Sequence, residues 1–448
     1  MASSFFKRLG EKIAVQSASE AKGIVVNPYQ LAAIGNRSRV VSQQARRYVR
    51  GALGFLPGLD MAAERLTLQR IPLDKVLLGY QAGLTGKEFA QAIGNMMWTS
   101  IPLSKGPHVD LLDRAKVFGL EASIGSDFQD SSYGRLAASC IEVSGDFFGN
   151  TTIDGAVDHA RAFVGSFLDK SHREVDYKNG TEGGRIVHVH PIAHSDCYQV
   201  IDGHHRLARL SAMGATEVEV SVRGTPVTTA LQDHLNSMTW LGGKREIYQP
   251  LEAPELQSEW PLVRTCTDRL SRMTQMVEHL GIADDATYLD VGACYGWFVS
   301  SFVDMGFDGY GIEIDPMAPG LAQAAYGLDP ARIATGDAVE FLRSAKSPWD
   351  VTSCFSVLHH FVLGRGSCGP DQFMKLLDDA TGKVLFIDTG QDCEAWFEQS
   401  LPGWNPEFIR DYLIKNTTFR DVIDLGPDED RIVPFHHNYG RHLFACIR

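Results

Sequence analysis

The sequence predicts an α/β protein in which a central, mostly parallel sheet carries helices on both faces. Short apolar strands alternate with amphipathic helices through the second half of the chain, which is typical of such a sheet. The first of these strands, residues 288–291, runs into a glycine turn that opens a helix. An earlier stretch, residues 185–222, follows the order strand, strand, turn, helix and strand. It predicts a second, smaller α+β domain ahead of the sheet.

Length and composition limit the class of protein. The 448 residues are enough for two or three domains, and 44% hydrophobic with 22% charged residues is ordinary for a globular chain. The net charge of −13 argues against a general nucleic-acid-binding surface, because such surfaces neutralise phosphates with lysine and arginine. The eight cysteines form no C-x-x-C pair, and neither a secretory leader nor a membrane-length apolar run is found. We therefore expect a reduced, cytoplasmic protein.

Changes in composition divide the chain into four parts. Residues 1–50 carry nine lysines and arginines against two glutamates, and we expect them to contact an anionic membrane surface or an acidic protein. An ordinary leader or docking helix with a solvated face is the alternative. Residues 51–240 form the smaller domain with a helical extension, the proline-containing residues 241–264 form a linker, and residues 265–448 form the larger domain.

The helical extension shows apolar residues at helical spacing, which predicts helices near residues 86–97 and 154–168. Residues 66–73 are predicted to be an extended segment that leads into the domain. Residues 104–112 are polar and turn-like, so we expect a solvated loop there. An amphipathic helix over residues 265–282 should lead into the larger domain.

One turn of the smaller domain carries residues that could bind a ligand: an Asp-Gly pair is followed by two histidines and an arginine. The next apolar residues give the helix a buried face, so the cationic residues lie on its first turn. Cationic groups at the positive end of a helix are unfavourable unless an anion offsets them, and free N–H groups with His and Arg suit a phosphate. The alternative is that the aspartate caps the helix and the histidines are structural. The predicted nucleotide-binding residues are Asp202, Gly203, His204, His205 and Arg206.

This strand–turn–helix resembles the ParB/sulfiredoxin-like fold, whose members bind nucleotides at this place. The resemblance covers residues 100–240, and its specific part is residues 201–214. It implies ATP with magnesium as a ligand and a kinase activity as one outcome. Reductase activity is not expected, because Gly203 stands where such members need a cysteine. DNA partitioning is not expected either, because the turn has a different polar run.

Histidine and cysteine residues near this turn do not predict a resident metal. Zinc sites usually show close paired spacings, and no second cysteine completes a pair here. A magnesium ion carried by a nucleotide is the better expectation, because magnesium keeps few protein ligands. The residues weighed as metal ligands were His188, His190, His194, Cys197, His204 and His205.

The glycine turn after the first strand is the centre of the larger domain. Gly292 and Gly296 allow a tight turn and close approach of a ligand to the backbone. Asp290 lies at the strand's carboxyl end, where open α/β sheets bind ligands. Glu313 follows the first glycine by 313 − 292 = 21 residues, close to the ~20 expected for a ribose-binding carboxylate. Cys294 stands where a dinucleotide motif has its second glycine, which weighs against a pyrophosphate ligand.

Together with residues 310–315, 334–338, 350–361 and 383–388, this turn resembles the class I S-adenosylmethionine-dependent methyltransferases over residues 265–448. The resemblance implies S-adenosylmethionine as the cofactor, with the turn at its methionine end, an acidic residue on the ribose hydroxyls, and an Asp-Ala pair at the adenine. The alternatives are a surface acid at position 313 and a turn residue at position 337. The implied cofactor-binding residues are Asp290, Gly292, Ala293, Tyr295, Gly296, Glu313, Ile314, Asp337, Ala338 and Ser356.

Methyl transfer needs an aligned acceptor and, for a neutral hydroxyl, a group that removes its proton. Candidate bases must project from the carboxyl ends of the strands, and we predict His359, His360 and Asp388. Packing in the sheet for His359 and helix capping for Asp388 are the alternatives, and an anionic acceptor would need no base. For Arg441, the alternative to acceptor binding is an ion pair with the acids at 428–430. The predicted acceptor-binding residues are Gln391, Glu394 and Arg441.

The two resemblances together predict a methyltransferase with a nucleotide-binding partner domain. We favour an enzyme that phosphorylates an acceptor such as a glycan terminus and then methylates it, because bacterial polysaccharide chain-terminating enzymes combine these activities. One alternative is an O- or N-methyltransferase of a small molecule or natural product, whose first domain is a docking or dimerisation module. Another is a nucleotide-gated binding or sensor protein. We expect a homo-oligomer in the cytoplasm, peripheral to the inner membrane surface.

Overall fold

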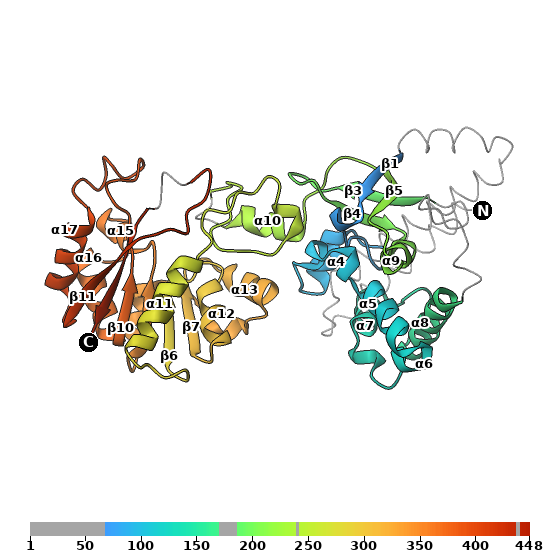
Figure 1. Cartoon of the computed structure of the whole chain (residues 1–448), viewed down its shortest axis with the longest axis horizontal. Helices are drawn as coiled ribbons and strands as arrows, with labels where there is room; N and C mark the ends of the chain where they lie inside the picture. Colours follow the sequence, from blue (N-terminus) through green and yellow to red (C-terminus); the bar gives the residue numbers. More distant parts are fainter. Residues whose placement is uncertain (1–67, 170–185, 239–241, 436–439) are drawn as a thin grey trace, which may run out of the picture.

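The computed structural model describes residues 68–169, 186–238, 242–435 and 440–448 (Figure 1). The chain has two lobes, each built on its own sheet, and a connecting segment runs between them beside α10 (Ala230–Ser237). The basic residues 1–50 lie outside the described residues, so the predicted contact with a membrane or protein stays a prediction. None of the helices in the described ranges combines the length and apolar character that a bilayer crossing requires.

The N-terminal lobe contains a five-stranded sheet in the order β1-β5-β3-β4-β2. The predicted strand–strand–helix–strand pattern is confirmed, with α9 (His204–Ala212) between the last two strands. β3 runs antiparallel to β4 and parallel to β5, while β1 closes one edge against β5. The strands are β1 (Leu68–Pro72), β2 (Val76–Leu77), β3 (Val187–Pro191), β4 (Tyr198–Asp202) and β5 (Glu217–Val222).

Helices between β2 and β3 supply the rest of this lobe's core. The helix predicted over residues 154–168 is α8 (Ile153–Leu168), and the one predicted over 86–97 is shorter, ending at Ala92. The solvated loop predicted over residues 104–112 is wrong, because α5 begins at Pro107, after Gly106, and buries Val109, Leu111 and Leu112. Proline at the first helical position suits this start. The helices are α4 (Gly86–Ala92), α5 (Pro107–Phe118), α6 (Leu120–Ser123), α7 (Ser132–Ser144) and α8.

The connecting segment, residues 242–266, has little regular structure apart from one short 3₁₀ turn, Pro254–Leu256. It nevertheless carries buried side chains. Leu256 and Trp260 pack in a cluster that includes Leu235 of α10 and Tyr295 of the larger lobe. The segment therefore packs against both lobes.

The C-terminal lobe contains a seven-stranded sheet in the order β11-β12-β10-β9-β6-β7-β8. Five strands pair in parallel, and β12 runs antiparallel to both β10 and β11, so six of the seven strands point the same way. The chain starts in the middle at β6, moves to one edge and returns to the other side at β9, which places the crevice of such a sheet at the carboxyl ends of β6 and β9. The strands are β6 (Thr287–Val291), β7 (Asp308–Glu313), β8 (Ile333–Thr335), β9 (Trp349–Cys354), β10 (Thr381–Ile387), β11 (Asp421–Pro427) and β12 (His442–Ile447).

Helices cover both faces of this sheet, as predicted. Tyr288 packs on the face covered by α11, α12 and α13, while its neighbour Leu289 packs on the face covered by α14, α15, α16 and α17. This alternation follows from the two-residue period of a strand. The chain is thus an α/β protein whose larger sheet is Rossmann-like. The helices are α11 (Thr267–His279), α12 (Trp297–Asp304), α13 (Ala318–Tyr326), α14 (Ala338–Ser344), α15 (Leu358–Val362), α16 (Pro370–Ala380) and α17 (Pro406–Asn416).

Candidate cofactor and acceptor site

The turn between β6 and α12 adopts the left-handed backbone that its glycines predict. The φ angles are +82° at Gly292 and +84° at Gly296, and a Cβ on Gly292 would lie 2.5 Å from Val357 Cγ2. Cys294 is left-handed as well, with φ of +56°, which is a strained conformation for a residue with a side chain. Contacts from outside the turn must therefore hold this conformation.

Asp290 lies buried behind the turn, with 2% of its surface exposed. Ser353 Oγ donates a hydrogen bond of 2.6 Å to Asp290 Oδ1, and the Tyr288 hydroxyl lies 2.6 Å from the same Oγ. Burial raises the pKa of Asp290 to about 7, and the charge of Glu313 acts in the same direction. A cationic ligand beside this carboxyl group would favour its charged form.

Glu313 ends β7 directly across from the turn. Its Oε2 accepts a hydrogen bond of 2.8 Å from Cys294 N–H, and its Oε1 accepts from the N–H groups of Ile314 (2.8 Å) and Asp315 (3.2 Å). Only 7% of Glu313 is exposed, so the alternative of a surface acid is wrong, whereas the apolar Ile314 beside it is 67% exposed. The structure thus brings together the glycine turn, a fixed carboxylate and an uncovered apolar side chain.

Asp337 and Ala338 lie next to Glu313, because Gly336 N–H donates to the Glu313 carbonyl oxygen at 2.9 Å. Asp337 is the N-cap of α14, and its Oδ1 accepts from the N–H groups of Val339 (2.7 Å) and Glu340 (3.2 Å). The alternative of a structural turn residue is therefore confirmed, and an additional contact of Asp337 with adenine stays a prediction.

Asp388, at the end of β10, belongs to a buried group of charges. Ser356 N–H donates to its Oδ1 at 2.7 Å, and Arg269 forms an ion pair with its Oδ2. Arg269 also reaches Asp428 at 2.7 Å, and Arg264 Nη1 lies 3.2 Å from the same Asp428 oxygen. Two arginines thus neutralise the predicted base Asp388, and the group does not cap a helix. This geometry favours a structural role over proton removal.

Arg441 and Glu394 form a second buried ion pair. Arg441 Nε and Nη2 donate to the two Glu394 oxygens at 2.7 and 2.9 Å, and Arg441 Nη1 donates to Ser356 Oγ at 2.6 Å. The alternative for Arg441, an ion pair with the acids at 428–430, gives way to this bidentate contact with Glu394, and the predicted acceptor binding stays a prediction. Ser356, a predicted cofactor residue, contacts Asp388 and Arg441, and its contact with the cofactor stays a prediction.

Gln391 follows the same loop and is 1% exposed. Within the described residues, neither its side-chain oxygen nor its nitrogen has a hydrogen-bond partner. A buried amide without a partner costs free energy, so Gln391 is the predicted acceptor residue whose side chain remains available for a ligand.

The two predicted histidine bases differ in their surroundings. His359 Nδ1 accepts a hydrogen bond of 3.2 Å from Gly390 N–H, which places the proton of the neutral ring on Nε2. Burial and the nearby Arg441 lower the pKa of His359 to about 2. His360 is exposed, and desolvation together with Arg365 lowers its pKa. His359 is therefore a neutral donor, and His360 is the histidine of the pair that can take up a proton.

In the N-terminal lobe, the histidines of the Asp202–Arg206 turn point inward. His204 is 9% exposed, and His205 Nε2 forms a hydrogen bond of 2.8 Å with the Tyr133 hydroxyl. The His108 ring lies 5.5 Å from that of His204 and 4.8 Å from that of His205. Burial lowers the pKa of all three, to about 4 for His204. The imidazoles are neutral structural groups and do not supply positive charge to a phosphate.

The remaining residues of this turn also differ from the capping alternative. Gly203, with φ of +112°, is the N-cap of α9 and no side chain caps the helix. Asp202 instead accepts a hydrogen bond of 3.2 Å from Arg206 Nη2. A phosphate would therefore have to be bound by the backbone N–H groups of α9 and by Arg206, which stays a prediction.

The histidine cluster makes the N-terminal lobe sensitive to acid. His108, His204 and His205 have folded-state pKa values below the ordinary 6.5, so the unfolded chain binds more protons below that pH. Their contribution to stability is complete above pH 6.5 and is lost as the pH falls toward 4. Calorimetric unfolding at pH 7.5, 6 and 5 should show a falling midpoint.

A variant can separate this cluster from general acid effects. Neither ring nitrogen of His108 has a hydrogen-bond partner in the described residues, so His108→Phe keeps the packing and removes one titrating group. We expect a smaller fall of the unfolding midpoint between pH 7.5 and 5 in this variant. The exposed His279→Asn serves as control and should follow the wild type. An unchanged slope in His108→Phe would contradict the prediction.

One group of carboxylates in the described residues has the spacing of a cation site, formed by Asp268, Asp428 and Asp430. Asp430 Oδ1 accepts from Asp268 N–H at 2.6 Å and its Oδ2 accepts from Arg269 N–H at 3.0 Å. Asp428 is neutralised by Arg269. The group therefore satisfies the first N–H groups of α11 and does not require a metal.

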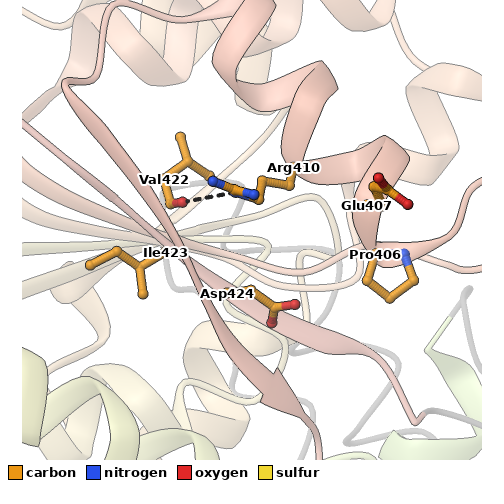
Figure 2. A pocket seen from close by; sticks show the side chains of 6 residues that line it. All are labelled: Pro406, Glu407, Arg410, Val422, Ile423 and Asp424. Atoms are coloured by element: carbon orange, nitrogen blue, oxygen red, sulfur yellow. Dashed lines mark hydrogen bonds between the residues drawn. The ribbon is translucent and has the colours of Figure 1, made fainter.

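A surface hollow lies along β11 and α17, far from the glycine turn (Figure 2). Arg410 Nε donates to the Val422 carbonyl oxygen across it. β11 is the edge strand, separated from β6 by three strands of the sheet. The hollow is therefore no part of the site at the carboxyl ends of β6 and β7. It is lined by Pro406, Glu407, Arg410, Val422, Ile423 and Asp424.

Two residues that the sequence did not single out contact the cofactor side of the larger lobe. Gln249 of the connecting segment bonds the glycine turn, and His234 Nε2 of α10 lies 3.0 Å from the Met317 carbonyl oxygen, just after Glu313. Neither residue belongs to a recognisable motif. Their positions depend on how the lobes pack.

Comparison with known proteins gives similar folds at low identity. No protein-family model and no curated protein matches the chain. Among solved structures, the bifunctional kinase-methyltransferase WbdD is 19% identical over 47% of this chain and 45% of its own, with a TM-score of 0.36. The aligned part thus spans less than half of WbdD. Magnesium protoporphyrin IX methyltransferase (ChlM) from Synechocystis PCC 6803, with bound SAH, is 16% identical over 40% of this chain and 82% of its own, with a TM-score of 0.31.

A SAM-dependent methyltransferase from Archaeoglobus fulgidus is 13% identical over 41% of this chain and 95% of its own, with a TM-score of 0.29. These structural neighbours are methyltransferases, and the likeness is one of fold. The ParB/sulfiredoxin-like assignment of the N-terminal lobe stays a prediction. What the described chain itself shows is an α/β protein with a Rossmann-like sheet in its larger lobe and a smaller lobe of mixed helices and strands ahead of it.

Proposed function

We propose that the chain is an S-adenosylmethionine-dependent methyltransferase whose cofactor binds at the carboxyl ends of β6 and β7. The observation that supports this most is the position of Glu313, whose carboxylate faces the glycine turn at 2.8 Å from Cys294 N–H. A carboxylate held there can accept from two ribose hydroxyls. The exposed Ile314 gives an adenine ring an apolar surface, and we assign the methionine end to the Gly292–Gly296 turn.

The chemistry that the cofactor supplies is a methyl group on a sulfonium sulfur. The protein's task is to bind the acceptor in line, to exclude water and to remove a proton where the acceptor is a neutral hydroxyl. We assign proton removal to the exposed His360 and acceptor binding to the Gln391 amide. His359 acts through its Nε2–H as a donor to the acceptor. The pairs Arg269–Asp388 and Arg441–Glu394 hold the loops that carry these groups.

For the first lobe, we favour the docking module over the kinase. Support comes from the contacts of α10 and the connecting segment with the methyltransferase lobe and from the inward-facing His204 and His205. The acceptor class on this reading is a small molecule or a glycan. In the kinase alternative, ATP with magnesium binds at α9 and an acceptor is phosphorylated before it is methylated. The phosphates would then have to bind without positive charge from His204 and His205.

Calorimetric titration of the chain with S-adenosylhomocysteine and, separately, with ATP and magnesium tests the proposal. We expect binding of S-adenosylhomocysteine. Binding of ATP that is lost in Arg206→Ala would restore the kinase reading, and absence of ATP binding would leave a single-reaction methyltransferase. Failure to bind S-adenosylhomocysteine would contradict the proposed function, and binding without methyl turnover on any acceptor would favour a sensor.

A further inference from the structure

We propose that Gln249 is a positioning residue for the cofactor turn, and that the connecting segment thereby forms the outer wall of the cofactor site. This inference rests on the proposed function. Gln249 comes from the segment between the lobes, 46 residues before Tyr295, and it is 6% exposed. It lies outside every motif that marks the methyltransferase sheet.

The side-chain amide of Gln249 binds the turn at three backbone groups. Its Oε1 accepts hydrogen bonds from the N–H groups of Tyr295 (3.0 Å) and Trp297 (3.2 Å). Its Nε2 donates to the Ala293 carbonyl oxygen at 3.3 Å. Both donor and acceptor functions of the amide are thus directed at the turn.

One of these contacts lies at the start of a helix that has no side-chain cap. α12 begins at Trp297 after Gly296, which has no side chain to satisfy the first N–H groups of the helix. In most helices a Ser, Thr, Asp or Asn at that position provides this acceptor. Here glycine is required by its φ of +84°, so the acceptor has to come from elsewhere in the chain. Gln249 provides it.

Cys294, the turn residue between these contacts, faces the Glu313 carboxylate, to which we assign the ribose hydroxyls. Cys294 lies between Ala293 and Tyr295, both held by Gln249, and Cys294 N–H donates to Glu313 at 2.8 Å. Its left-handed backbone is strained. Gln249 on one side and Glu313 on the other therefore fix the orientation of this peptide, and loss of Gln249 frees the turn to relax away from Glu313.

The connecting segment is itself anchored, which gives Gln249 a fixed position. The Tyr326 hydroxyl donates to the Pro250 carbonyl oxygen at 2.7 Å, directly after Gln249. Further along, Ser100 Oγ of the N-terminal lobe donates to the buried Glu255 at 2.6 Å, and Thr229 Oγ1 donates to the same oxygen at 3.3 Å. The N-terminal lobe thus reaches the cofactor turn through one continuous segment.

The test compares S-adenosylhomocysteine affinity by calorimetry in four proteins, each checked for folding by circular dichroism. Gln249→Met keeps the volume and removes the three hydrogen bonds, and we expect about tenfold weaker binding, the size that one lost cap brings. Gln249→Glu keeps the acceptor for the two N–H groups, and we expect affinity within about threefold of the wild type. Gln257→Ala, in the same segment and exposed, should bind as the wild type does.

The outcomes are distinguishable. If the wild type does not bind S-adenosylhomocysteine, the proposed function fails. If the wild type binds and the folded Gln249→Met binds equally well, the positioning role is overturned, even if the variant melts earlier, because a purely structural role lowers stability without changing affinity. Should Gln249→Met not fold, Gln249→Ala, which also removes the three hydrogen bonds, takes its place: weaker binding in the folded variant supports the role, and wild-type affinity overturns it.

Discussion

Glu313→Ala should weaken the binding of S-adenosylhomocysteine at least ~100-fold. Two hydrogen bonds from ribose hydroxyls to a carboxylate contribute about 1.5–3 kcal/mol each, and every 1.4 kcal/mol corresponds to about tenfold in affinity. The same variant also releases Cys294 N–H, so the turn loses one of its hydrogen bonds. Calorimetric titration of the folded variant measures the effect.

Two further variants make this prediction specific. Glu313→Gln keeps one acceptor oxygen, and we expect a loss of about tenfold. Glu278→Ala removes an exposed acid on α11 and should leave the affinity unchanged. If Glu313→Ala binds within threefold of the wild type, the ribose does not lie on this carboxylate and the assignment is wrong.

Arg269→Met should destabilise the C-terminal lobe by about 3–5 kcal/mol, because it leaves buried carboxylates without compensation. Arg269 is 3% exposed and neutralises both Asp388 and Asp428. Burial raises the pKa of Asp428 to about 6, and Arg269 opposes that rise. Without the arginine this pKa rises further, so a proton removes the uncompensated charge at low pH. The loss of stability should therefore be larger at pH 8 than at pH 6.

Thermal unfolding at the two pH values measures this difference. Lys375→Met is a suitable control, because Lys375 pairs with Asp379 on the exposed face of α16, and such pairs contribute about 0–1 kcal/mol. A shift in Arg269→Met no larger than in the control would show that the buried charges do not hold the acceptor side together.

Much of the larger lobe follows from the sequence by simple rules. Because parallel strands end at the same edge of a sheet, Asp290 and Glu313 were expected beside each other once their strands were recognised. β6 is almost wholly buried and mainly apolar, which makes it easy to find, whereas β7 contains two glycines and exposed residues and is found mainly by the acid at its end. The helix starting at Pro107 was missed because its first residues are polar, although a Gly-Pro start is itself a helix signal.

Other features have no local signal in the sequence. A pattern of residues places His204 and His205 on the first turn of a helix, but the direction of their side chains depends on α5 and α7 packing against that turn. The pairing of Arg269 with Asp388 joins residues 388 − 269 = 119 positions apart. Gln249 binds the glycine turn from another segment, so no spacing rule along the sequence reveals it.

A crystal structure of the chain with S-adenosylhomocysteine tests the central claim most directly. We expect the ribose hydroxyls within hydrogen-bonding distance of the Glu313 carboxylate, the adenine against Ile314, and the homocysteine end at the Gly292–Gly296 turn. Electron density for the ligand in the N-terminal lobe, along β11, or nowhere would contradict the account.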